Sequence, residues 1–283
     1  MNALILPIAL GVIMLSLGIS LTIADFKRAL LYPKAVITAL ICQIILMPVV
    51  CFFIVTGFGL GPELAVGLML LSASPGGATA NLYSHLAGGD VALNITLTAI
   101  NSVLSIVTIP VILGLSLQYF MGTERAIPLQ TGKVIFTLVI VIIPVVIGMI
   151  ARHRNPALAK RMEKPLSVLA ALCLLLIITV VLMRQWNELV NHFPVVGAAV
   201  TLFNVLSLAA GYSIALLLRL EKRQAIAIGM EVGMHNTALV SGLALTLLNN
   251  PLIAMPPSLY GILTVFIAAA FGFAVRLKKE GVA

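Results

Sequence analysis

Apolar residues run along this chain in long unbroken stretches that short polar segments separate. An α-helix rises about 1.5 Å per residue and the hydrocarbon core of a bilayer is about 30 Å thick, so about 20 apolar residues span it. The strands of a membrane β-barrel would instead alternate over about ten residues, which these continuous stretches do not. The pattern therefore predicts an all-α polytopic membrane protein with nine transmembrane helices, at 3–23, 34–57, 63–87, 91–120, 132–151, 166–184, 194–219, 224–247 and 252–275.

The composition excludes a water-soluble globular protein. Of the 283 residues 61% are hydrophobic and 9% are charged, and the mean hydropathy is +1.17. Soluble domains carry roughly 45–50% apolar and about 25% charged residues. The net charge of +8 would also fit a nucleic-acid-binding protein, so the positions of the basic residues have to decide between the two.

The basic residues are divided unequally between the two sides of the predicted membrane. Nine spans put all but three of the 17 Lys and Arg residues on one side, and leave Arg125, Lys133 and Arg184 on the other. Cytoplasmic loops carry the excess of Lys and Arg, which predicts a cytoplasmic C-terminus and an N-terminus outside. This distribution explains the positive charge, and we expect no nucleic-acid partner. The larger group comprises Lys27, Arg28, Lys34, Arg152, Arg154, Lys160, Arg161, Lys164, Arg219, Lys222, Arg223, Arg276, Lys278 and Lys279.

Two of the predicted spans are interrupted in their middle. The third contains Pro75, Gly76 and Gly77, which favour leaving the helix, and the eighth places Glu231 and His235 at membrane depth. Unwound backbone inside a membrane is tolerated only where protein buries it or where it lines a polar cavity. Both interruptions therefore indicate an internal site.

The interruptions also occupy corresponding positions in two halves of the chain. Residues 1–122 would form a four-span N-terminal repeat, and residues 132–283 a five-span C-terminal half, within one transporter domain over 1–283. Asn81 and Asn236 follow the two breaks, and Gln43 in span two corresponds to Asn204 in span seven. Because the second copy lies five spans, an odd number, after the first, it crosses the membrane in the opposite orientation. Such inverted repeats are typical of secondary transporters.

Glu231 is the one acidic residue well inside a predicted span, and no Lys or Arg lies similarly deep in a span to pair with it. A buried carboxylate without a basic partner suits a mobile cation. Oxygen ligands for a hard ion such as sodium are available from Gln43, Asn81, Asn94 and Thr98 and from the carbonyls of Val232 and Met234. The free N–H groups of half-helices would attract an anion. These features predict cation-coupled transport of an organic anion, with no cofactor.

Several stretches resemble the bile acid:sodium symporter family: SPGGATANL at 74–82, GDVALNITLT at 89–98 and EVGMHNTAL at 231–239. The likeness extends from LPIALGVIM at 6–14 to the last predicted helix. The chain resembles a bacterial member of the family in its nine-helix form. The resemblance implies a panel and a core domain, two broken helices that cross, two sodium sites and alternating access in the bacterial inner membrane. It also implies an organic anion as substrate, such as a bile acid or a small carboxylate like pantoate or a keto acid.

The resemblance assigns site residues. The first sodium site would comprise Asn81, Asn94, Thr98 and Glu231, and the second Gln43, Glu231, the carbonyls of Val232 and Met234, and residue His235. Substrate contacts would come from Ala78, Thr79, Asn236 and Thr264.

Three positions depart from the family pattern. Ala80 replaces a hydroxyl residue, Asn94 replaces a smaller hydroxyl residue, and His235 replaces a glutamine. An imidazole is a poor ligand for an alkali ion. The second site therefore uses only the backbone of residue 235, is absent, or is linked to protons.

Two other kinds of membrane protein are alternatives. In a membrane-embedded hydrolase, Glu231 and His235 would share a helix face and hold zinc, but no third ligand is evident. A channel could use the same polar crossing. We expect a symporter rather than an enzyme, and the organic anion, sodium and the lipid bilayer as its partners.

Overall fold

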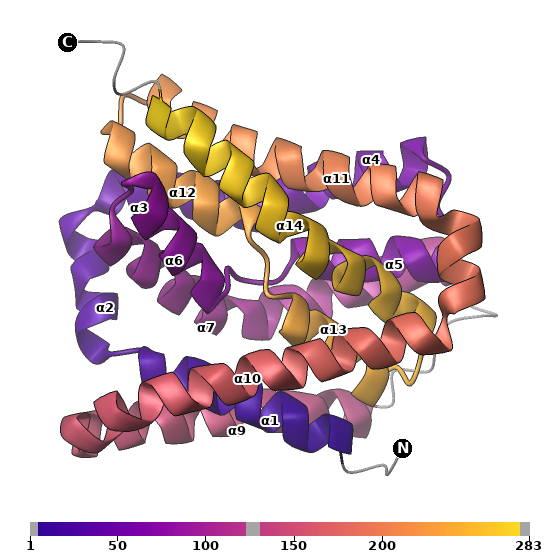
Figure 1. Cartoon of the computed structure of the whole chain (residues 1–283), viewed down its shortest axis with the longest axis horizontal. Helices are drawn as coiled ribbons and strands as arrows, with labels where there is room; N and C mark the ends of the chain where they lie inside the picture. The colour runs from indigo at the N-terminus through magenta and orange to yellow at the C-terminus, as the bar shows by residue number, and fades with distance from the viewer. Residues whose placement is uncertain (1–4, 123–130, 278–283) are drawn as a thin grey trace.

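The computed structural model describes residues 5–122 and 131–277, without the side chains at 5–6, 78, 131–141, 182, 184, 189 and 277. Within these residues every regular element is a helix (Figure 1). The elements are α1 (Ile5–Ser20), α2 (Ile23–Arg28), the 3₁₀ turn η1 (Ala29–Leu31), α3 (Pro33–Ile41), the π-helical turn η2 (Cys42–Leu46), α4 (Met47–Gly57), α5 (Pro62–Ser72), α6 (Ala78–Ala87), α7 (Val91–Ser116), the π-helical turn η3 (Leu117–Met121), α9 (Thr131–Arg154), α10 (Pro156–Arg184), α11 (Trp186–Leu217), α12 (Lys222–Gly233), α13 (Thr237–Thr246) and α14 (Pro251–Leu277).

Length and apolar character make several of these helices candidate membrane spans. Over the described residues five helices qualify: Pro33–Gly57, Val91–Met121, Pro156–Val181, Val190–Leu217 and Pro251–Arg276. The pair Pro7–Ser20 and Ile23–Leu31, bent by 60°, is a sixth candidate, and α5 and α13 are shorter apolar helices. These helices confirm the all-α polytopic membrane protein, while the count of nine crossings stays a prediction.

Some predicted boundaries differ from the helices observed. The predicted start at 166 is wrong, because α10 already begins at Pro156, where Asn155 accepts a hydrogen bond from the N–H of Leu158 at 3.0 Å. The charged residues before 166 suggested a loop, but they lie on the polar first turns of this helix. There Arg152 of α9 binds Glu163 of α10 at 2.9 Å. Helix α11 likewise begins before the predicted residue 194, at Trp186.

The chain bends sharply after the first apolar helix. Thr22 and Asp25 form a reciprocal cap at the start of α2, in which the Thr22 hydroxyl accepts from the N–H of Asp25 and the Asp25 carboxylate accepts from the N–H of Thr22. Such a cap fixes where a helix begins. Arg28 donates to the same carboxylate at 3.2 Å. The predicted span at 3–23 therefore ends where a short second helix, which the sequence did not indicate, starts.

The helices form two groups around the broken segments. Helix α1 packs on α9 and α10 along one side of the molecule, and α11 packs on α12 and α14 along the other (Figure 1). Gly18 and Gly148 let α1 and α9 approach closely, since a Cβ at Gly18 would lie 2.2 Å from the carbonyl oxygen of Val145. Helices α5, α6 and α13 lie between the groups, and α12 contacts α6 (Figure 1).

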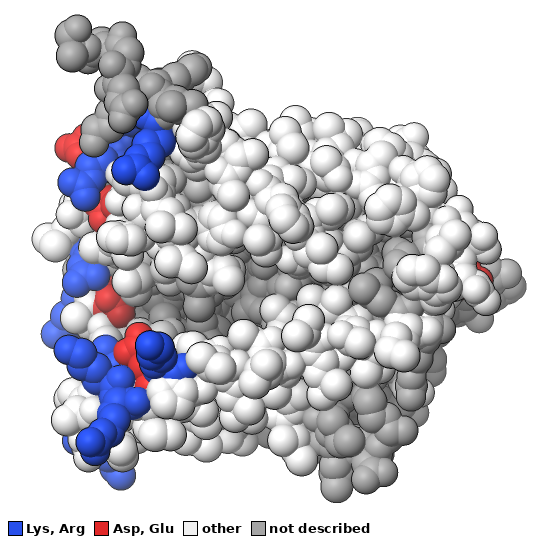
Figure 2. Space-filling view, in the orientation of Figure 1, with Lys and Arg blue, Asp and Glu red and all other residues white. Residues whose placement is uncertain are grey.

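The surface is that of a protein in lipid. Large apolar side chains face outward, and Phe53 and Phe266 are 68% and 69% exposed, whereas Phe203 and Tyr260 are fully buried. Figure 2 shows the described Lys and Arg side chains gathered at one end of the molecule, where α2 lies and α12 begins. The long apolar face beside them carries almost no charge in this view. These features fit an integral membrane protein.

Candidate functional site

The two interrupted helices meet at their breaks. Helix α5 stops before Pro75 and α6 begins after the two glycines, while α12 and α13 are separated by three residues that include Met234. The N–H of Gly77 donates to the Met234 carbonyl at 3.1 Å, and the N–H of Asn236 donates to the Pro75 carbonyl at 2.8 Å. Unwound backbone in lipid needs internal partners, and here each break supplies them to the other.

A buried amide side chain caps the first half of each broken helix. Gln43 Nε2, in the π-helical turn η2, donates to the carbonyls of Ser72 at 3.3 Å and Ser74 at 2.8 Å. Asn204 Nδ2, in α11, donates to the carbonyl of Gly233 at 2.7 Å. The last carbonyls of a helix have no partner within it, and these amides supply one. Gln43 and Asn204, which the sequence paired, thus have the same local task.

Glu231 is fully buried, and its carboxylate accepts three hydrogen bonds. Thr98 donates to Oε2 at 2.6 Å, while Asn101 Nδ2 at 3.1 Å and the N–H of Gly76 at 3.2 Å donate to Oε1. Across the described residues no basic side chain forms an ion pair with this carboxylate. A Cβ at Gly76 would lie 2.3 Å from Oε2, so only glycine admits the carboxylate here. As far as the described residues go, the site therefore holds an acidic group with no countercharge.

The residues predicted for the first sodium site lie on α6, α7 and α12. Asn94 Nδ2 donates to the carbonyl of Ala227 at 2.8 Å, and Thr98, one turn later on α7, contacts both Glu231 and the Asn94 carbonyl. The buried oxygens Oδ1 of Asn94 and Asn81 have no hydrogen-bond partner within the described part of the chain. Unpaired buried oxygens are costly, and a cation would satisfy them.

Three residues, Ala80, Val232 and Met234, bring no side-chain oxygen to these sites. Ala80 is fully buried against apolar side chains such as Met230. Val232 and Met234 are also buried and can contribute only their carbonyls, of which that of Met234 already accepts a hydrogen bond from Gly77. The departure at residue 80 thus leaves its backbone as the available ligand.

His235 contacts aromatic side chains of α11 and α14. Its Nδ1 lies 3.0 Å from the hydroxyl of Tyr260, and its ring packs on Phe203, with 5.2 Å between ring centroids. The Tyr260 hydroxyl donates to the carbonyl of Gly233 at 2.6 Å. Since that hydroxyl already donates its hydrogen, it accepts from Nδ1, which places a hydrogen on Nδ1 of His235.

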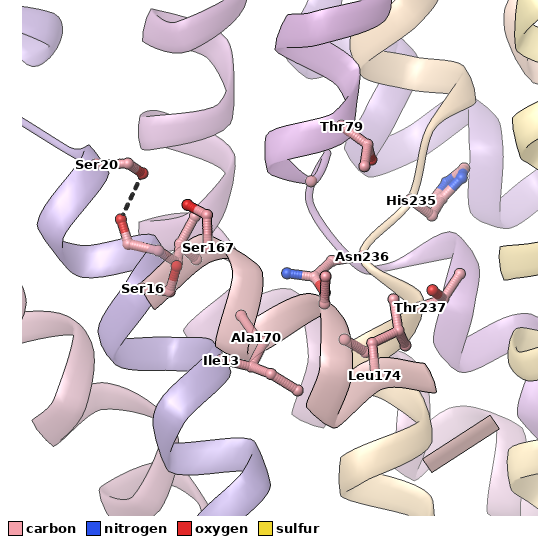
Figure 3. A pocket seen from close by; sticks show the side chains of 14 residues that line it. Ile13, Ser16, Ser20, Thr79, Ser167, Ala170, Leu174, His235, Asn236 and Thr237 are labelled. Carbon is pink, nitrogen blue, oxygen red and sulfur yellow. Dashed lines mark hydrogen bonds between the residues drawn. The ribbon is translucent and has the colours of Figure 1, made fainter. Parts of the chain in front are cut away.

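A cavity of about 180 Å³ opens at the beginnings of α6 and α13 (Figure 3). Thr79 and Asn236 line it, and the Asn236 oxygen caps α13 by accepting from Leu239 at 3.0 Å, so its amide nitrogen faces the cavity. Thr264 is absent from the described lining and binds Asn204 Nδ2 at 3.1 Å instead. The side chain of Ala78 lies outside what the structure describes.

Sequence reasoning missed several polar residues around both regions. The hydroxyls of Ser16, Ser20 and Ser167 line the opposite wall of the cavity, on α1 and α10 (Figure 3). Asn101 binds the buried carboxylate, and its spacing could have revealed it. Residues 94, 98, 101, 105 and 108 are all polar and recur at helical intervals, which places them on one face of α7. Tyr260 gave no comparable signal.

Comparison with known proteins finds relatives whose names describe transporters. The chain is 29% identical to an uncharacterized sodium-dependent transporter of Bacillus subtilis (strain 168) over 91% of this chain and 78% of the relative. It is 27% identical to the human ileal sodium/bile acid cotransporter over 97% and 80%. A probable chloroplastic sodium/metabolite cotransporter of Oryza sativa subsp. japonica is 28% identical, over 88% of this chain and 58% of that protein.

A family model settles the assignment more broadly than any single relative. The model described as the Sodium Bile acid symporter family matches residues 7–192, which is more than half of the chain. The names of the relatives describe sodium-dependent transport, in keeping with a carboxylate held in the bundle without a countercharge. The chain therefore belongs to the sodium bile acid symporter family, whose members are transporters and not enzymes.

Proposed function

We propose that this protein is a sodium-coupled symporter of a small organic anion that works by alternating access. The observation that carries the proposal is the fully buried carboxylate of Glu231, which has three donors and, within the described residues, no basic partner. The sodium-dependent transport named for the relatives supports the same coupling ion. A proton-coupled carrier draws no support from those names.

The sodium ligands we propose are those of the sequence prediction. Asn81, Asn94, Thr98 and Glu231 would hold the first ion, and the unpaired oxygens of Asn81 and Asn94 support this set. The second ion would lie by Gln43, Glu231 and the carbonyls of Val232 and Met234, with only the backbone of His235, because the ring of that residue binds Tyr260. Oxygen ligands of this kind suit a hard monovalent cation.

The substrate we propose is a small carboxylate, and it would lie in the cavity between Asn236 and Ser167. Two helix N-termini point their N–H groups toward this space, which favours an anion although no Lys or Arg is among its lining residues. A volume of about 180 Å³ is close to the roughly 150 Å³ of a protein cavity that holds benzene. The cavity thus favours a compound of pantoate or keto-acid size over a steroid. Thr79 would contribute its hydroxyl from α6.

The architecture we propose has nine crossings, in two inverted repeats over 1–122 and 132–283, with a panel and a core that rock against each other. The equivalent amide caps from Gln43 and Asn204 and the paired breaks support the repeat. The grouping of basic residues supports a cytoplasmic C-terminus and an outside N-terminus in a bacterial inner membrane.

Transport in proteoliposomes tests the proposal. Purified protein would be reconstituted, and uptake of labelled pantoate and pyruvate measured with an inward sodium gradient, with an equal potassium gradient, and with sodium plus a proton ionophore. We expect accumulation that needs sodium and survives the ionophore. Uptake that ignores sodium but collapses with the ionophore would establish the proton-coupled alternative, and equilibration without accumulation would indicate a channel.

A further inference from the structure

A second, much smaller cavity lies between η2, the end of α5 and the middle of α7. Its volume is about 10 Å³, which is about the space that one water molecule needs. The polar side chains that line it are Gln43, Asn101 and Thr108, and Pro75 of the first break lies beside them. Gln43 and Asn101 are each 3% exposed, so both amide side chains are cut off from bulk solvent.

Hydrogen bonds fix which way both amides point. Gln43 Nε2 donates to two carbonyls, those of Ser72 and Ser74, and Asn101 Nδ2 donates to the carboxylate of Glu231. Turning either amide round would put its oxygen against these acceptors, which repel it. Oε1 of Gln43 and Oδ1 of Asn101 are therefore the free atoms, and neither has a partner within the described part of the chain.

The polar side chains of this cavity have three oxygens that are free to accept. Thr108 donates its hydroxyl hydrogen to the carbonyl of Ala73 at 3.3 Å, so only its lone pairs remain for the cavity. Pro48, also in the wall, has no N–H. The negatively charged Glu231 carboxylate lies next to the cavity wall, because it accepts a hydrogen bond from Asn101, which lines the cavity. Three such oxygens near a buried carboxylate attract a small hard cation.

We propose that this cavity binds one of the two coupling sodium ions, with Asn101 and Thr108 as ligands beside Gln43. The inference rests on the proposed sodium-coupled function and changes the second site that the sequence predicted. Instead of using residue 235, this chain would complete the site from α7. The polar face of α7 would then serve both ions, the first at Asn94 and Thr98 and the second at Asn101 and Thr108.

Equilibrium binding of radioactive sodium to the purified full chain in detergent tests this assignment. We expect Asn101→Leu and Gln43→Leu each to halve the sodium bound per chain, and the double variant to lose no more than either single one, because all three lack the same site. The remaining ion should keep its half-saturating concentration within about twofold, since its own ligands are unchanged. Gln118→Leu removes an exposed amide from the same helical segment and should bind as the wild type does.

The outcomes separate this inference from the function on which it rests. Wild-type protein that binds no sodium would contradict the proposed function itself. Wild-type binding in Asn101→Leu would show that the cavity holds water, and loss of both ions would show that Asn101 only positions Glu231; either result overturns the inference. Each variant is first checked for a single gel-filtration peak, and Asn101→Ala, which also lacks the oxygen, replaces Asn101→Leu if that protein does not fold.

Discussion

Replacing Glu231 by glutamine removes the charge and leaves the shape of the site. The amide oxygen can take the place of Oε1 and accept from Gly76 and Asn101 as the carboxylate does. The amide nitrogen then donates to Thr98, whose own hydrogen goes to the Asn94 carbonyl, 3.1 Å away. No buried polar group loses its partner, and the cost of burying an isolated charge disappears. Without sodium, Glu231→Gln should therefore melt at or above the wild-type temperature.

Glu231→Gln should instead weaken the binding of sodium. A pair of unit charges about 4 Å apart contributes about 4 kcal/mol at an effective dielectric constant of about 20. Since about 1.4 kcal/mol corresponds to a factor of ten, the sodium affinity should drop on the order of 1000-fold. The assay is a thermal-melting titration of purified protein in detergent, with sodium replaced by N-methylglucamine at constant ionic strength. A ligand stabilises only the state that binds it, so the sodium-induced rise in melting temperature should vanish.

Glu188→Gln is the matched control, because Glu188 is exposed near the start of α11 and pairs with His192. It should respond to sodium as the wild type does. If Glu231→Gln kept a wild-type half-saturating sodium concentration, the buried carboxylate would not be an ion ligand, and the reasoning from its missing countercharge would fail.

Three further substitutions probe the crossing and the cavity. Gly76→Ala should abolish transport and lower the melting temperature, because its Cβ would collide with the buried carboxylate. Gly77→Ala should remain active, because its Cβ would meet nothing closer than 3.4 Å. Equal loss of transport in both variants would contradict the steric argument. Tyr260→Phe should cost about 1–3 kcal/mol of unfolding free energy in a denaturation series, because it leaves buried partners unpaired, while the exposed Tyr119→Phe should cost almost nothing. Asn236→Ala should raise the KM for substrate more than the half-saturating sodium concentration, and equal changes in both would argue against separate roles.

The breaks could be predicted because their signals are local. Pro75 with its two glycines cannot continue a helix, and a carboxylate at Glu231 within an apolar run needs a special environment whatever surrounds it. Most of the helices followed from hydrophobic length alone. The α10 boundary failed for a physical reason, because the first turns of a membrane helix can extend beyond the hydrocarbon and carry charges there, as Glu163 does.

The partners of these local features could not be predicted in the same way. The contact of Asn204 with Tyr260 and the turn of His235 toward α14 depend on side chains that meet only in the folded bundle. Asn101 was within reach, because its helical spacing from Asn94 and Thr98 is visible in the sequence. Nothing local distinguishes Tyr260 from an ordinary membrane tyrosine.

The mutual hydrogen bonding of the two breaks also bears on how the protein is made. Gly76 and Glu231 are 155 residues apart in the chain. Translation adds about 5–20 residues per second, so roughly 8 to 30 s pass between synthesis of the two segments. During that interval the second break has not yet been synthesised. The N–H of Gly77 and the carbonyl of Pro75 in the first break therefore still lack their final hydrogen-bond partners. The ion site is accordingly completed after insertion of the C-terminal half, and a chain truncated before α12 keeps an unfinished helix in the bilayer.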